Sequence, residues 1–380
     1  MTVTTGMIGA GFYNRNSAPQ WSATEYVLPW VEGAALDMEL AEPPSTIGLA
    51  DYGCSEGRNS IAVMTRLVAA CRTRTARPIQ TIHSDLATND FSELFKQLRP
   101  EGLRPKGLRP EGLRPEGARP EDRTVYGDSD VYSAAVGGSM FDQLLPPRSL
   151  HFATTFNAIG FMARRPLDRL PGYILPNGPS KTNSVGHVSD EDRQAFADQA
   201  AVDLEAFLQA RAVELVPGGK LLIQVFGAGE DYRTCDGIYD VLNDAMLELL
   251  DEGMLSQDGY ETFYQPVYFR TLDELTAPFA EAEASCAPLF RLERAETYEV
   301  PVPFEQDLRE TGDVGRYANA YTNFLRAFTE PVLRLHFHDH PSVAAAIEQI
   351  YRRIETLLRK MPDRYTFHYV ALAALLTRKD

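Results

Sequence analysis

The sequence predicts an α/β fold: an open, doubly wound and mostly parallel sheet with helices on both faces and a helical cap. Three observations support this prediction. Short apolar stretches alternate with stretches of helical spacing between residues 46 and 226. The first stretch ends in Asp51 and a turn with Gly53 and Gly57, which leads into a helix. Beyond about residue 237 the apolar residues follow mainly helical spacing.

The individual elements follow in chain order. Short apolar runs, the first ending in an acid, predict strands at residues 46–51, 79–83, 131–136, 150–154 and 220–226. Helices between them are expected at 59–70 and 191–215, and Pro217-Gly218-Gly219 forms the turn before the last strand. Amphipathic spacing predicts cap helices at 241–250, 317–335 and 343–358, whereas 289–300 and 369–376 could return as edge strands. We therefore expect a core over 1–235, a mainly helical cap over 236–365 and a returning strand within 366–380.

A pentapeptide repeat interrupts the core between residues 98 and 122. Its unit is Leu-Arg-Pro-Glu-Gly with small changes, so a proline returns at every fifth position. That spacing forbids a regular helix, and one leucine per unit buries too little apolar surface to offset the entropy of ordering the chain. We expect a disordered surface insertion within one domain; a repeat that docks a partner is the other interpretation.

The bulk composition excludes several classes of protein. The 380 residues carry a formal net charge of −16 with a pI near 5.0, whereas proteins that bind phosphate backbones cluster basic residues. No apolar run reaches the roughly 18 residues that indicate a membrane span. The four cysteines form no C-x-x-C pair. We therefore expect neither nucleic acid nor a membrane as a partner, a cytoplasmic location and reduced thiols.

Acidic residues end two neighbouring predicted strands. Asp51 precedes the glycine turn, and Asp85 with Leu86 follows the next strand. Because open α/β sheets bind ligands beyond the carboxyl ends of their strands, Asp85 could hold both hydroxyls of a ribose while Leu86 packs on an adenine. A nicotinamide oxidoreductase would share this pattern, but the turn is not G-x-G-x-x-G. The segment Pro217-Gly218-Gly219 before an apolar strand is common in methyltransferases and favours that class.

Four segments, taken in order, resemble the SABATH family of S-adenosylmethionine-dependent carboxyl methyltransferases. They are YNRNSAPQ at 13–20, DYGCSEGRN at 51–59, SDLATNDF at 84–91 and VGGSMF at 136–141. The resemblance implies a Rossmann-like class I methyltransferase sheet, S-adenosylmethionine as cofactor and S-adenosylhomocysteine as its product. It implies that the cofactor is bound by Tyr13, Ser17, Asp51, Gly53, Cys54, Asn59, Asp85, Leu86, Ser139, Met140 and Phe156.

The same resemblance implies a small-molecule carboxylic acid as substrate, a methyl ester as product, and a homodimeric, bacterial-looking member of the family. Where the family carries a tyrosine and then a tryptophan that holds the substrate carboxylate, this chain has Asn157 and Phe161. Phenylalanine donates no hydrogen bond, so either Asn157 with Gln20 recognises the carboxylate or the accepted nucleophile differs. The substrate contacts implied are Gln20, Asn157, Phe161, Tyr239, Tyr321 and Leu325.

No metal site is expected. Some relatives bind a cation near the cap, but the corresponding positions here are Ser180, Glu261, Phe263 and Tyr264, which is not a ligand set. Three histidines alternate at positions 336, 338 and 340, yet they end a predicted helix, so solvated side chains are favoured over a metal site.

No catalytic acid or base is expected either. A carboxylate with a pKa of roughly 4 is already ionised at neutral pH, so positioning in a dry aromatic pocket should dominate and can supply roughly 7 to 11 kcal/mol. Other functions stay open at this point: N- or phenol O-methylation, a binding protein that keeps the cofactor pocket without turnover, and the nicotinamide oxidoreductase.

Overall fold

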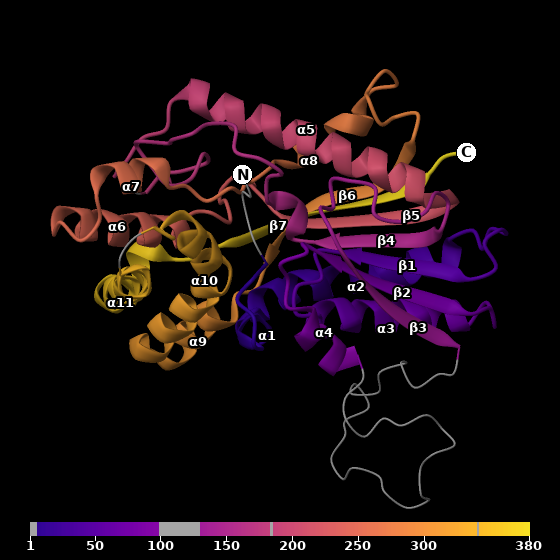
Figure 1. Ribbon diagram of the computed structural model, residues 1–380, viewed down its shortest axis with the longest axis horizontal. Helices are drawn as coiled ribbons and strands as arrows, with labels where there is room; N and C mark the ends of the chain where they lie inside the picture. Colours follow the sequence, from indigo (N-terminus) through magenta and orange to yellow (C-terminus); the bar gives the residue numbers. More distant parts are fainter. Residues whose placement is uncertain (1–5, 99–129, 183–184, 340–341) are drawn as a thin grey trace, which may run out of the picture.

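The computed structural model describes residues 6–98, 130–182, 185–339 and 342–380. Apart from Leu98, the predicted pentapeptide insertion lies outside the described residues. The described strands form one seven-stranded sheet in the order β3-β2-β1-β4-β5-β7-β6 (Figure 1). Their bounds are β1 Ile47–Tyr52, β2 Ile79–Asp85, β3 Val131–Gly137, β4 Leu150–Phe156, β5 Leu215–Phe226, β6 Phe290–Val300 and β7 Tyr369–Arg378.

The central strands form because they are apolar along their whole length. Every residue of β1 is buried, as is every residue of β4 except Phe156 at its end. Strands covered on both faces show such continuous apolar runs, which is typical of parallel sheets. Strands β1 to β5 run parallel to one another, whereas β7 runs antiparallel to β5 and β6. The predicted doubly wound sheet is confirmed.

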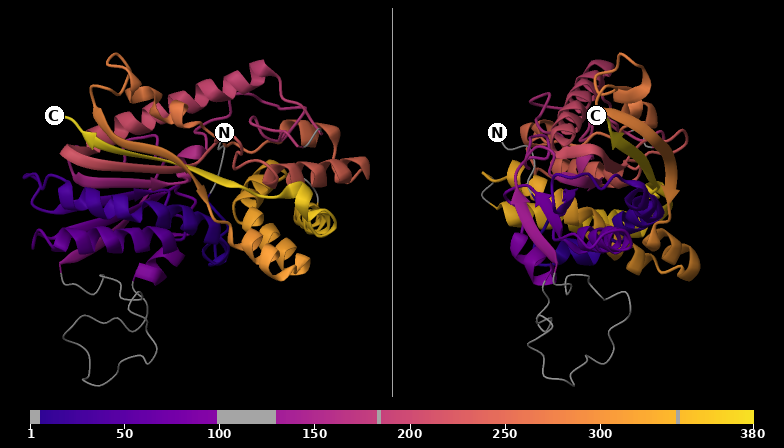
Figure 2. Two further views of the ribbon diagram at one scale, coloured as in Figure 1. Left: turned by 180° about the vertical axis from the view of Figure 1, so that it is seen from behind. Right: turned by 90° about the vertical axis from the view of Figure 1, so that its right-hand side faces the viewer.

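Helices cover both faces of the sheet, and a helical group lies beyond one of its ends (Figures 1 and 2). Helices α2 and α3 pack together on one face, while α5 and α8 pack on the other. Helices α6, α7, α9, α10 and α11 form the cap, in which α11 packs on both α6 and α10. The helices are α1 Phe12–Asn16, α2 Ala18–Asp37, α3 Arg58–Arg72, α4 Phe91–Leu98, α5 Asp190–Glu214, α6 Ile238–Asp251, α7 Gln257–Thr262, α8 Leu272–Ala280, α9 Pro303–Thr311, α10 Val314–His336 and α11 Val343–Lys360. Within the part of the chain that the structure describes, no helix has the length and apolar character to cross a membrane.

Of the two late segments expected as edge strands, only β7 differs from the expectation. β6 is mostly exposed or half-buried and lies at the edge of the sheet, whereas β7 is buried in all but its last residue and lies between β5 and β6. An internal strand needs apolar residues on both faces, and the sequence of β7 supplies them. The range 236–365 expected for the cap therefore contains one strand of the sheet.

β5 also begins earlier than expected. It starts at Leu215 directly after α5 and includes Pro217-Gly218-Gly219, the segment predicted as a turn. Leu215 pairs with Leu150, and the register shifts before Lys220 pairs with Phe152. The glycines thus form an irregularity inside the strand, with Gly218 at φ 76°.

Candidate active site

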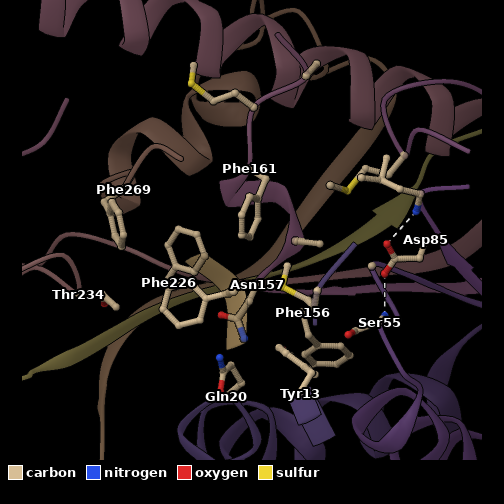
Figure 3. A pocket seen from close by; sticks show the side chains of 18 of the residues that line it. Tyr13, Gln20, Ser55, Asp85, Phe156, Asn157, Phe161, Phe226, Thr234 and Phe269 are labelled. Carbon is tan, nitrogen blue, oxygen red and sulfur yellow. Dashed lines mark hydrogen bonds between the residues drawn. The ribbon is translucent and has the colours of Figure 1, made fainter. Parts of the chain in front are cut away.

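A cavity of about 260 Å³ lies where the parallel strands end and β7 begins. Its wall includes the last residues of β2, β4 and β5, which are Asp85, Phe156 and Phe226, and the first residue of β7, Tyr369. Figure 3 shows Asp85 and Ser55 toward one side and Phe226 and Phe269 toward the other. The cavity therefore occupies the position at which open α/β sheets bind ligands.

The loop after β1 is held against the end of β2. The backbone N–H groups of Gly53 and Cys54 both donate to the carbonyl oxygen of Ser84, at 2.8 and 2.9 Å. Gly53 has φ 93°, a conformation that side chains disfavour, and a Cβ there would lie 2.2 Å from the Cβ of Ala158. A glycine is needed at this position, and its bare backbone faces the cavity.

Asp85 presents its carboxylate to the cavity from the end of β2 (Figure 3). Oδ2 accepts the N–H of Ser55 at 2.6 Å, and Oδ1 accepts the N–H of Leu86 at 2.7 Å. Burial raises the pKa of Asp85, although the two backbone hydrogen bonds oppose the shift. Each oxygen has a further lone pair, so the carboxylate can accept two hydroxyl donors side by side.

Other residues predicted to bind the cofactor divide into two groups. The structure brings one group to the cavity wall: Tyr13, Gly53, Asp85, Leu86, Ser139, Met140 and Phe156. The other group is not among the residues that line the cavity: Ser17, Asp51, Cys54 and Asn59. Ser17 and Cys54 are buried, and burial raises the pKa of the Cys54 thiol, as expected for packing rather than reactivity.

Asp51 is a buried carboxyl at the end of β1. It is 2% exposed and accepts a hydrogen bond from the Thr154 hydroxyl at 2.8 Å. Burial raises its pKa from 3.8 to about 6, while hydrogen bonds from Ser60 and Thr154 oppose the shift. Since the folded state holds this proton more tightly than the unfolded state, Asp51 lowers the stability of the folded state as the pH rises from about 4 to about 6.

Asp51→Asn is therefore expected to stabilise the ligand-free protein at pH 7.5 by roughly 1 to 3 kcal/mol, because the neutral amide carries no burial cost of a charge. At pH 4 the two proteins should be nearly equal. Urea unfolding at both pH values measures the difference. The exposed Asp37→Asn is the control, and a stability gain that is the same at both pH values would contradict the assignment.

The substrate residues predicted from the sequence divide in the same way. Gln20, Asn157, Phe161 and Tyr239 line the cavity, whereas Tyr321 and Leu325 do not. Tyr321 is fully buried and donates its hydroxyl to the carbonyl oxygen of Tyr365 at 3.1 Å. Helix α10 instead presents Phe324 and Phe328 to the cavity. Each residue turns a helix by about 100°. Phe324 and Phe328 therefore lie on a different face of α10 from Tyr321 and Leu325, the residues expected to contact the substrate.

The wall away from Asp85 is aromatic and uncharged. No lysine, arginine or histidine lies among the described residues that line the cavity. Gln20 and Asn157 place two side-chain amides there, close to each other in Figure 3. Oε1 of Gln20 is buried without a hydrogen-bond partner in the described structure, and only a donor group could relieve the desolvation cost of this acceptor.

Several residues of the site were missed from the sequence. They are mainly aromatic side chains from distant segments: Phe226, Phe269, Phe324, Phe328, Phe367 and Tyr369. Phe226 could have been found, because it ends a predicted strand of the sheet. Glu56 was also missed: its buried carboxylate accepts the backbone N–H of Gly11 at 2.5 Å and of Asn14 at 2.9 Å. These bonds hold the N-terminal segment, with Tyr13, against the loop after β1.

The described residues contain no group of three or more His, Cys, Asp or Glu side chains that could hold a metal ion. Of the positions that correspond to a cation site in some relatives, Glu261 pairs with Arg169, and Phe263 and Tyr264 are buried. Of the alternating histidines, His336 is half-buried with Nε2 at 3.0 Å from the Gly259 carbonyl oxygen. Position 340 lies outside the described residues.

A strand-end glycine loop, an acid at the next strand end and an enclosing cap are features of α/β proteins that bind a nucleoside cofactor beyond the carboxyl ends of their strands. A sequence profile described as SAM dependent carboxyl methyltransferase matches residues 3–379. The chain belongs to this family. Its cofactor is accordingly S-adenosylmethionine, and it is an enzyme that transfers a methyl group to the carboxylate of a small organic acid.

Individual relatives agree with this assignment. A probable jasmonic acid carboxyl methyltransferase from Theobroma cacao is 24% identical over 98% of this chain and 96% of its own. A benzoic acid/salicylic acid carboxyl methyltransferase from Petunia hybrida is 25% identical over 97% and 96%. Among solved structures, loganic acid methyltransferase with SAH superimposes with a TM-score of 0.73 at 21% identity, covering 99% of both chains. That last similarity shows the fold. The predicted family, fold class, activity and cofactor are confirmed.

Proposed function

We propose that the enzyme methylates a monocarboxylic acid whose remaining body is apolar and uncharged, and that Gln20 and Asn157 hold the carboxylate. The observation that carries this proposal is the aromatic wall with two amides and no cationic side chain among its described residues. Amide N–H groups can donate to a carboxylate. A second charge on the substrate would be buried without a partner, and that costs several kcal/mol by order of magnitude.

We propose further that the cofactor lies along the side of the cavity formed by Asp85 and Met140. The two unused lone pairs of Asp85 support a bidentate bond to the ribose hydroxyls, and the bare backbone of Gly53 leaves room for the amino acid portion. Leu86, Ser139 and Met140 are the proposed adenine contacts. Ser17, Asp51, Cys54 and Asn59 would then support the site from behind the wall.

When bound, S-adenosylmethionine would supply a methyl group on a sulfonium to the carboxylate oxygen, and sulfur would keep the electron pair of the broken sulfur–methyl bond. The chain's own residues bind and orient the acid, and the aromatic wall excludes water. No proton has to move, since the carboxylate is already ionised. A phenol or a ring N–H would have to lose a proton, and the described lining offers no histidine or lysine to take it, which favours the carboxylate.

Incubating the enzyme with labelled S-adenosylmethionine and a panel of acids tests the proposal by product mass. We expect methyl esters of neutral aromatic or terpenoid monocarboxylic acids and none from dicarboxylic acids or amino acids. Thermal shift provides the cofactor control: S-adenosylhomocysteine at about 100 times its Kd should add roughly 2.7 kcal/mol of stability, and NAD should add none. Methylation of amines or phenols alone would contradict the proposal.

Gln20→Ala is expected to raise the KM for the preferred acid about tenfold, which is what one hydrogen bond to a charged group is worth by order of magnitude. The affinity for S-adenosylhomocysteine should not change. Gln265→Ala is the matched control, because Gln265 is a buried glutamine with an unpartnered amide that does not line the cavity. Steady-state kinetics on both variants measures these KM values. Equal KM values for the wild type and Gln20→Ala would count against a contact between Gln20 and the substrate carboxylate.

We also propose that the enzyme works in the cytoplasm as a homodimer, with neither nucleic acid nor a membrane as partner. The net charge of −16 and the four free, buried cysteines support the location and the partners. The homodimer and a bacterial source rest on the resemblance of the sequence motifs alone. Light scattering on the purified chain measures its oligomeric state.

A further inference from the structure

Asn157 is fixed by its backbone at the end of β4. It has φ 61°, in the left-handed region that asparagine tolerates better than most residues. Its backbone N–H donates to the carbonyl oxygen of Gln224 on β5 at 2.8 Å. The side chain is 9% exposed and lines the cavity. The position of the amide is therefore set by the sheet, and its direction depends on what contacts the two ends of the amide.

Two donors meet the oxygen of that amide. Oδ1 of Asn157 accepts the Tyr369 hydroxyl at 2.8 Å and Nε2 of Gln224 at 3.3 Å. Both lone pairs of the oxygen are then used. As long as Gln224 keeps its orientation, turning the Asn157 amide by 180° would set its NH2 against the NH2 of Gln224, and two donors would face each other. Nδ2 has no hydrogen bond within the described residues and is the end of the amide left for a ligand.

We infer that Tyr369, together with Gln224, is a positioning residue that orients the Asn157 amide so that its NH2 donates to the substrate carboxylate. This inference rests on the proposed function. Tyr369 is 3% exposed at the start of β7, and Gln224 is fully buried on β5, the strand that pairs with β7. Burial raises the pKa of Tyr369 well above its usual value, so the hydroxyl keeps its proton and can donate.

The orientation has a consequence for specificity. With its oxygen occupied, Asn157 offers only donors to the cavity, and a carboxylate offers only acceptors. A primary amide of the same shape would bring a competing NH2 group against Nδ2. The Tyr369 and Gln224 contacts thus favour the acid over its amide.

Tyr369→Phe tests the inference directly. The variant should raise the KM for the preferred acid about tenfold, the worth of an ordinary hydrogen bond, with little change in kcat or in the Kd for S-adenosylhomocysteine. It should also weaken the preference for the acid over the corresponding amide as a competitive inhibitor. Tyr260→Phe is the matched control: Tyr260 is also 3% exposed and donates its hydroxyl to an asparagine Oδ1, that of Asn243, at 2.7 Å, away from the cavity. The KM of Tyr260→Phe for the preferred acid should equal that of the wild type.

A double-mutant cycle separates orientation from direct substrate contact. In an Asn157→Gly background, which removes the amide and keeps the left-handed backbone accessible, Tyr369→Phe should have no further effect on KM. Additive effects would overturn the inference, since Tyr369 would then act independently of Asn157. If Tyr369→Phe fails to fold, Gln224→Met replaces it in the cycle. This variant removes the longer of the two hydrogen bonds to Oδ1 of Asn157, at 3.3 Å, and is expected to raise KM about threefold.

The outcomes also distinguish the inference from the proposed function. If the wild type methylates an acid and Tyr369→Phe keeps the same KM and the same acid preference, the inference alone fails. If the wild type methylates no acid, both fail.

Discussion

Asn157→Asp is expected to lower kcat/KM for the preferred acid about a thousandfold. The two side chains have the same shape, and the Tyr369 hydroxyl and Gln224 amide can donate to the new carboxylate as they do to Oδ1. The NH2 that faces the substrate becomes an oxygen. Two like charges about 4 Å apart repel by about 4 kcal/mol at an effective dielectric constant of 20, and that energy corresponds to about three powers of ten in rate.

Because the substitution keeps the donors at Tyr369 and Gln224 satisfied, it should leave the cofactor side of the cavity intact. The Kd for S-adenosylhomocysteine, measured by titration calorimetry, is the internal control and should stay within a few-fold of the wild type. Lowering the pH should partly restore activity, since a protonated carboxyl no longer repels the substrate. A variant with wild-type kcat/KM would show that Asn157 does not face the carboxylate.

The part of the site that we propose for the cofactor was predictable from the sequence because its signals are local. Gly53, Asp85 and Leu86 follow directly after apolar strands, and the strand-end rule then places them together without any long-range knowledge. Asp51 also lies at the predicted strand end, where its carboxyl accepts a hydrogen bond from Thr154, and it is not among the residues that line the cavity.

The part that we propose for the substrate was less predictable because its wall comes from distant segments. Phe226, Phe269 and Phe367 meet only after β5, the cap and β7 have packed. Helix α10 is buried on much of its surface, so its sequence does not tell which buried face meets the cavity and which meets the neighbouring helices. The same reasoning applies to β7, whose Tyr369 contacts Asn157 across a separation of 212 residues.

The second large effect is expected on the cofactor side. Asp85→Asn should weaken S-adenosylhomocysteine binding at least about hundredfold. Each oxygen of Asp85 accepts a backbone N–H, from Ser55 and from Leu86, so whichever end carries the new NH2 faces a donor. The cavity also loses one of two charged acceptors for the ribose, and each such hydrogen bond contributes roughly 1.5 to 3 kcal/mol.

Titration calorimetry with S-adenosylhomocysteine at several pH values tests this prediction on the wild type, on Asp85→Asn and on a control variant. Burial raises the pKa of Asp85, so this carboxyl gains a proton at a higher pH than an ordinary aspartate and then accepts hydrogen bonds less well. Wild-type affinity should therefore drop as the pH falls, and the drop should be smaller in Asp85→Asn. Asp90→Asn, in the same loop and away from the cavity wall, should bind like the wild type. Near-normal binding by Asp85→Asn would place the ribose elsewhere and would leave the acid at the end of β2 a purely structural role, holding Ser55 against Leu86.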